Sequence, residues 1–208
     1  MNSIGKTIVL VLLGLVGWQQ ITAKSPLEEP RWGSWLFLNI THDIGRHFFI
    51  RPYFEHCIVE GQQFECVYNR TTFGWRPLSW MHVGASYVPV RERGRWTQNM
   101  EIEAQGSLTS GALKVSLRER YRHGFTGSSY NELRTSFKVA YAVPNSRVGL
   151  YVAPEVFTWA GKWQKTRHYV GVTCACNRTV QLEGYYMYYA FKERSVEHIV
   201  GLGMNLNL

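Results

Sequence analysis

The sequence predicts an all-β fold: one antiparallel transmembrane β-barrel of ten to twelve strands, with ten preferred, after an N-terminal signal peptide. Apolar and polar residues alternate along segments such as 113–118 and 136–141, and a two-residue period gives a strand one apolar and one polar face. The polar face carries many Arg and Glu side chains, which a dry core would not tolerate unpaired. An apolar exterior around a polar interior is typical of a barrel in lipid.

The N-terminus has the features of an export signal. Lys6 precedes an apolar run that is shorter than the roughly 20 residues a helix needs to cross a bilayer. We therefore expect a signal peptide over residues 1–23, a short segment over 24–31 and the barrel over 32–208. An uncleaved N-terminal anchor is the alternative. The length after the signal suits a single domain.

Turn-forming residues divide the rest of the chain into eleven candidate strands. Because a single-chain barrel with both ends in the periplasm needs an even number of strands, we expect one of the first three segments to be wrong. The candidates are 33–41, 46–57, 63–73, 79–90, 95–105, 112–123, 131–143, 147–158, 166–176, 179–190 and 196–207.

The lengths of the connections predict the orientation of the barrel. Residues 144–146 and 176–178 form tight turns, whereas 123–130, 159–165 and 191–196 form longer connections. Short periplasmic turns and longer outer loops are typical of bacterial outer-membrane barrels.

The net charge of +8 raises the question of nucleic acid. The Arg and Lys residues are spread over the strands and do not form one patch, and an exported chain rarely meets nucleic acid. We therefore expect no nucleic-acid partner and no cofactor. Outer-membrane lipid and lipopolysaccharide are the expected partners of this charge, and the sequence points to no protein partner.

Face assignment by alternation predicts a charged inner wall. In a narrow lumen, opposite charges should form cross-strand Arg–carboxylate pairs that close it and fix the register. The alternative is a narrow polar passage or an anion site, because basic residues outnumber acidic ones. The predicted inner-wall residues are Arg51, Glu55, Arg70, Glu101, Glu103, Lys114, Arg118, Arg120, Arg134, Lys138, Glu155, Arg167 and Glu183.

Tryptophan residues at the ends of the predicted strands indicate aromatic girdles at the two membrane interfaces. A carbohydrate-binding platform is the alternative. Glu119 falls on the outward face, where a carboxylate is unfavourable in mid-membrane, so we expect it near an interface or beside a bulge. The tryptophans are Trp75, Trp80, Trp96, Trp159 and Trp163.

Cys57 and Cys66 flank the Gly61–Gln62 bond symmetrically. In a hairpin that turns there, they would lie opposite each other at a distance that a disulfide can bridge. A disulfide and a pair of free thiols both remain possible. The spacing of Cys174 and Cys176 favours free thiols, and the cysteines do not predict a metal site.

Several groups of residues occur in a characteristic order: 117–121 (LRERY), Leu150 with Tyr151, 155–157 (EVF), Arg167, Gly171, 182–185 (LEGY), His198 and 202–208. In order and spacing, from about Trp32 onward, the chain resembles domain-of-unknown-function family 2490. The resemblance implies an outer-membrane β-barrel of Gram-negative bacteria and no established activity. Such barrels often end in an aromatic residue that the outer-membrane insertion machinery reads, so Leu208 predicts less efficient assembly.

Barrel enzymes that cleave or modify lipid use a Ser–His pair oriented by a third group. The chain shows no recognisable nucleophile motif, so we predict no catalytic residues, and only the fold could bring His56, His82 and His168 together as a metal site. The Ser–His candidates are His82 with Ser86, His123 with Ser128, and His198 with Ser195.

The sequence thus predicts an integral protein of the cell outer membrane, with a structural or interactive role and a lumen closed by charge pairs. The first alternative is a narrow channel for small anions or polar solutes. The second is a lipid-modifying barrel enzyme.

Overall fold

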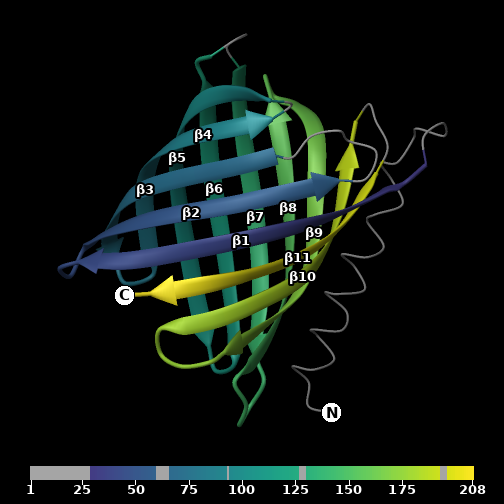
Figure 1. Ribbon diagram of the computed structural model, residues 1–208. Helices are drawn as coiled ribbons and strands as arrows, with labels where there is room; N and C mark the ends of the chain where they lie inside the picture. The colour runs from purple at the N-terminus through teal and green to yellow at the C-terminus, as the bar shows by residue number, and fades with distance from the viewer. Residues whose placement is uncertain (1–28, 60–65, 93, 127–129, 193–195) are drawn as a thin grey trace.

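The computed structural model describes residues 29–59, 66–92, 94–126, 130–192 and 196–208, so the predicted signal peptide lies outside it. The described residues form eleven strands and no helix, and the strands close into one barrel (Figure 1). The strands are β1 (Arg31–Ile44), β2 (Phe48–Val59), β3 (Cys66–Leu78), β4 (Met81–Glu92), β5 (Arg95–Ser110), β6 (Leu113–Gly124), β7 (Tyr130–Ala142), β8 (Val148–Trp159), β9 (Lys162–Ala175), β10 (Val180–Phe191) and β11 (Glu197–Asn207).

The structure contradicts two expectations. None of the first three predicted segments is wrong, and the barrel does not have the preferred ten strands. All eleven candidate segments have a counterpart among the described strands, and the barrel closes with an odd number. It does so because β1 pairs with β11 in parallel, while all other neighbours are antiparallel. Figure 1 shows the arrows of β1 and β11 side by side and pointing the same way. The described ends of the barrel chain therefore lie at opposite rims.

Side chains on both sides of the wall reinforce the parallel seam between β1 and β11. On the inner side, Arg31 bonds Glu197 at 2.8 Å, and the Asn39 amide donates to Asn205 at 2.9 Å. On the outer side, the ring of Trp32 stacks on His198 with 4.9 Å between centroids. The seam thus combines backbone pairing with polar and aromatic contacts along its length.

The connection between β8 and β9 is tight, contrary to the longer loop expected over 159–165. Trp159 pairs with Lys162, which leaves Ala160 and Gly161 as the turn. Both have positive φ, 48° and 72°, as a type I′ hairpin turn requires because its twist matches that of the strands. Short turns therefore occur at both rims, and connection length no longer predicts which rim faces the periplasm.

The alternation of faces is confirmed. On β5, Glu101 and Glu103 are 1% and 2% exposed, whereas Ile102 between them is 64% exposed. Leu117 on β6 and Phe137 on β7 are likewise exposed on the outside. The outer wall is thus apolar, and ionic side chains fill the inside of strands β2 to β9.

The interior is not uniformly polar. A cluster of buried apolar and aromatic side chains from β1, β2, β8, β10 and β11 lines one side of the lumen, and it includes Trp35, Tyr151, Tyr185, Met187 and Ile199. The charged wall lies mainly on β3 to β7. Basic side chains meet aromatic rings where the charged wall and this cluster adjoin.

Among the described residues, no helix is long and apolar enough to cross a membrane.

Candidate functional site: a cation-rich lumen

The side chains predicted for the lumen network all turn to the inside of the barrel. They come from eight strands, since alternate residues of each strand share its inner face. The network residues line the two lumen cavities or pair with residues that do: Arg51, Glu55, Arg70, Glu101, Glu103, Arg118, Arg120, Arg134, Lys138, Glu155, Arg167 and Glu183.

Two glutamates of β5 anchor the charged wall. Glu101 and Glu103 stand directly opposite Arg122 and Arg120 of β6 in the strand register. Arg122 Nε donates to Glu101 Oε1 at 2.7 Å, and Arg120 Nη2 donates to Glu103 Oε2 at 3.0 Å. Arg51 also donates to Glu103 from across the lumen. Such buried, charge-assisted bonds offset the large desolvation cost of the charges and discriminate against a shifted register.

Two further carboxylates continue the network towards β9. Glu155 Oε1 accepts from Arg118 at 3.2 Å, and its Oε2 lies 3.6 Å from Arg167. Glu132, two residues before Arg134, pairs with it at 2.7 Å and with Lys165 at 3.2 Å.

Each of these carboxylates is shared by more than one cation. Glu101 lies within 4 Å of Arg70, Arg120 and Arg122, with distances of 3.9, 3.5 and 2.6 Å. Glu103 bridges Arg51 and Arg120 in the same way. Sharing leaves the guanidinium groups less than fully neutralised, so the lumen is positive and attracts anions.

Aromatic rings, most of them on neighbouring strands, pack against several of the cations. The guanidinium of Arg167 lies over Trp35, Phe157 and Tyr189, at 4.8, 4.8 and 4.5 Å from the ring centroids. Lys138 Nζ lies 3.7 Å from the centroid of Tyr151. Cation–π contacts stabilise a positive charge without neutralising it.

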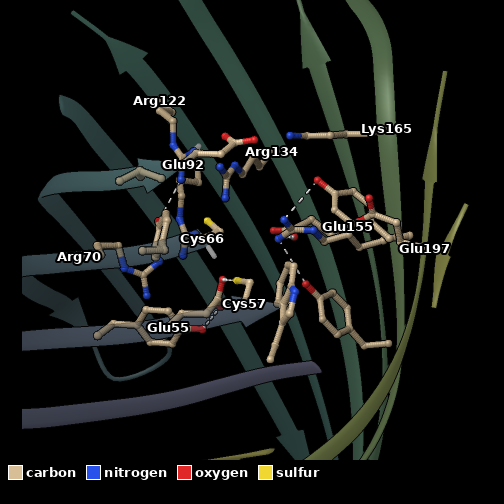
Figure 2. Close-up of a pocket in the computed structure, with 18 of the residues that line it drawn as sticks. Glu55, Cys57, Cys66, Arg70, Glu92, Arg122, Arg134, Glu155, Lys165 and Glu197 are labelled. Atoms are coloured by element: carbon tan, nitrogen blue, oxygen red, sulfur yellow. Dashed lines mark hydrogen bonds and ion pairs between the residues drawn. The ribbon is translucent and has the colours of Figure 1, made fainter. Parts of the chain in front are cut away.

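In the described part of the barrel, two cavities of about 290 Å³ each follow one another along the lumen. The first chamber lies at the rim where β1 begins, and Val59, Glu92, Lys165 and Glu197 are among the residues that line it. The second chamber lies towards the other rim and is lined by residues such as Asn39, Lys138 and Glu183. Figure 2 shows the first chamber with basic side chains directed into it from several strands.

The two chambers adjoin at five side chains, which we call the partition. Tyr53, Glu55, Arg70, Arg118 and Tyr169 line both cavities. The carboxylate of Glu55 accepts hydrogen bonds from the hydroxyl of Tyr53 and, at 3.4 Å, from the thiol of Cys57.

In the second chamber, Glu183 is held chiefly by neutral donors. The Tyr151 hydroxyl donates to it at 2.5 Å and the Asn205 amide at 3.1 Å. Asn205 accepts in turn from Asn39, so this network extends to the seam.

Sequence reasoning missed several members of the network. Arg122 and Glu132 follow the same alternation as Arg120 and Arg134, so the two-residue period alone could have found them. Lys165 was placed in a loop because the tight turn before β9 was not recognised. Glu197 lay in a predicted strand but was not singled out, and it now pairs with Arg31 and lines the first chamber.

Cys57 and Cys66 are directly paired across β2 and β3, as the hairpin symmetry predicted. Both thiols are free in this structure, and both line the first chamber (Figure 2). Cys174 and Cys176 are free and exposed, as their spacing predicted.

The structure does not assemble His82 and Ser86, the one candidate Ser–His pair of which it describes both residues. Ser86 Oγ lies 2.8 Å from Thr72 Oγ1, while His82 Nε2 lies 3.5 Å from Glu103. Ser128 and Ser195 lie outside the described residues. His56 and His168 point outwards, away from His82. Within the described ranges, no group of three metal-binding side chains gathers.

Exposed tryptophans stand at both rims. Trp75 and Trp80 are 46% and 50% exposed near one rim, and Trp96 and Trp159 are 55% and 48% exposed near the other. Glu119 is on the outer face, but it lies in the middle of β6 with a regular register to β5 and β7, so the expected position near an interface or beside a bulge is wrong. The Thr135 hydroxyl on β7 donates to it at 2.9 Å.

No protein-family model matches the chain, and no curated protein shows significant sequence similarity to it. The resemblance to domain-of-unknown-function family 2490 therefore stays a prediction.

Proposed function

We propose that the chain is an integral β-barrel of the bacterial outer membrane whose lumen is closed by an ion-pair network, with a structural or interactive role. The observation that carries this proposal is the triplet on β5. Glu101 and Glu103 are buried among arginines, and Ile102 between them is among the most exposed apolar side chains of the described residues. Apolar residues facing out around a charged interior match the needs of a lipid-embedded wall.

A water-soluble barrel would show the opposite pattern. A periplasmic lipid carrier would need an apolar cavity and a polar exterior, because large contiguous apolar surfaces in water favour association. Here large apolar side chains are exposed on every strand from β1 to β11, and the first chamber is lined by Arg, Lys and Glu.

The partition between the chambers supports a closed lumen. Arg70 is 7% exposed, and the hydrogen bonds that Glu55 accepts from Tyr53 and Cys57 tie the middle of the lumen together. We expect such a barrel to act through its rims and outer surface. Export by the predicted signal peptide, insertion by the outer-membrane machinery and contacts with lipopolysaccharide belong to the same proposal.

A second candidate is a narrow passage for small anions. It is favoured by the shared carboxylates, which leave the lumen positive, and by Arg118, whose side chain remains 30% exposed at the partition.

Two measurements test these proposals. Fractionation tests the location: the protein should stay with the outer membrane in high salt and carbonate and require detergent for extraction. Planar-bilayer recording separates the two roles, because a closed lumen predicts no stable conductance steps. Regular anion-selective conductance steps would favour the narrow passage over the closed lumen. Extraction of the protein without detergent would reject both proposed functions, because both require a barrel embedded in the membrane.

A further inference from the structure

The geometry points to a binding site for a small oxyanion in the first chamber, built on Arg167 with Trp35 and Arg70 as additional donors. This inference rests on the cation-rich lumen of the second candidate function, and it adds a ligand class and a site. Binding requires only the first chamber, so the site can exist whether or not the partition opens.

Three of the side chains that line this chamber, on β1, β3 and β9, carry a buried donor without an acceptor. Among the described residues, Arg167 Nε, Arg70 Nε and Trp35 Nε1 are buried and have no hydrogen-bond partner, and the three side chains line the first chamber. Arg70 and Trp35 are 7% and 6% exposed. Native proteins rarely leave such donors unpaired, because a buried N–H without an acceptor is unfavourable. Oxygen atoms of an anion would supply the missing acceptors.

The charge around these donors is also incomplete. Arg167 has Glu155 at 3.6 Å, but that carboxylate is nearer to Arg118, at 3.2 Å. Arg70 has Glu101 at 3.9 Å, and Glu101 is bonded more closely to Arg122. Both guanidinium groups therefore retain positive charge that an anion can neutralise.

Arg167 is held ready for such a ligand. Its guanidinium lies over the rings of Trp35, Phe157 and Tyr189. Nη2 donates to the Tyr189 hydroxyl at 3.3 Å and Nη1 to the Tyr169 hydroxyl at 3.5 Å, which leaves Nε without a partner. The rings fix the plane of the group, and a fixed planar guanidinium binds carboxylate or phosphate oxygens with two parallel bonds. Little conformational entropy is then lost on binding.

The size of the chamber limits the ligand. A volume of about 290 Å³ lies at the lower end of the range for small-molecule sites. It suits a phosphate or carboxylate group on a small body. A lipid phosphate would need to bring its acyl chains through a wall of continuously paired strands, so the ligand comes from the aqueous side.

Isothermal titration of the full chain with inorganic phosphate tests the site. The protein is held in a phosphate-free, uncharged detergent, and sodium chloride keeps the ionic strength constant. We expect saturable binding at one site. Trp35→Phe keeps the ring and removes only the N–H, and should weaken binding several-fold. Arg167→Gln should weaken it about tenfold or more, as for loss of a charged hydrogen bond.

Lys138→Gln is the matched control, since it removes one lumen charge from the second chamber only. Its affinity for phosphate should stay within about twofold of the parent. Absence of saturable binding, or an equal loss in Lys138→Gln and Trp35→Phe, would overturn the site. The site would also be overturned if lipopolysaccharide competed more strongly than free phosphate at equal phosphate content.

Trp35→Phe keeps the test valid if Arg167→Gln does not fold. Conductance is recorded separately, so a non-conducting barrel that binds phosphate separates this inference from the passage.

Discussion

Arg120 and Glu103 are register partners across β5 and β6, and their side chains are joined by a 3.0 Å hydrogen bond although both are almost fully buried. Strand pairing and charge pairing thus select the same alignment. A slip of β5 by one residue would turn Glu103 towards the outer wall, away from Arg120, and bring Ile102 inside.

Glu103→Gln should strongly destabilise the barrel, because it leaves Arg120 and Arg51 buried without their shared carboxylate. Removing one partner of a buried ion pair costs about 3–5 kcal/mol. Urea unfolding from lipid vesicles measures the change in the free energy of unfolding. Asp43→Asn is the control: its pair with Arg76, at 2.9 Å, is exposed and should contribute less than about 1 kcal/mol. Equal effects of the two changes would contradict a buried network.

Ile102→Arg should impair insertion because it places a charge on the outer wall near the middle of β5. We expect a cost of about 2–4 kcal/mol in lipid vesicles, as for a basic residue at mid-membrane. Gln105→Arg adds the same charge to the same strand on its inner face, where Gln105 lines the second chamber. Gln105→Arg should therefore destabilise the barrel less than Ile102→Arg. If Gln105→Arg is the more destabilising of the two, the lipid does not face the outer wall.

Gly201→Ala should disturb the aromatic side of the lumen. A Cβ at Gly201 would lie 2.0 Å from the Tyr185 ring, so the ring must move. Overpacking of this kind costs about 1–3 kcal/mol. Gly184 faces outwards, and its nearest neighbour would be Leu202 at 3.4 Å. Gly184→Ala should therefore leave the unfolding midpoint nearly unchanged, and a similar loss in both variants would show that Tyr185 is free to move.

Cys57 and Cys66 should form an intramolecular disulfide under mild oxidation, because they face each other across β2 and β3. Alkylation followed by mass spectrometry of peptides should show this pair linked and Cys174 and Cys176 still alkylated. We expect the bridge to add about 2 kcal/mol to the free energy of unfolding, which Cys66→Ser would abolish. Mixed disulfides between molecules as the main product would contradict the register.

The sequence predicted the face of each charged residue well because a two-residue period is a local property. Arg120 and Glu103 are placed inside by their apolar neighbours Tyr121 and Ile102 alone. The identity of their partners is not local: that Glu101 lies near Arg70 as well as Arg122 depends on the curvature of the closed sheet.

The closure of the barrel could not be predicted for the same reason. The pairing of Asn39 with Asn205 joins residues far apart in the sequence, and alternation is the same for a strand with a parallel or an antiparallel neighbour. The expectation of an even number came from a general rule for bacterial barrels. The sequence marks Ala160 and Gly161 as turn residues, but the connection was predicted to run to Lys165, whereas β9 begins at Lys162.

The orientation of the wall is tested most directly at two adjacent residues of β6, Leu117 and Arg118. Each is replaced by Cys in a background with the four native cysteines changed to Ser, labelled with a fluorophore and placed in vesicles that contain brominated lipid. Leu117 is 51% exposed on the outer face, and Arg118 lines both lumen chambers. We predict strong quenching at position 117 and little at 118. Equal quenching, or quenching at 118 alone, would contradict a lipid-facing apolar wall around a charged lumen.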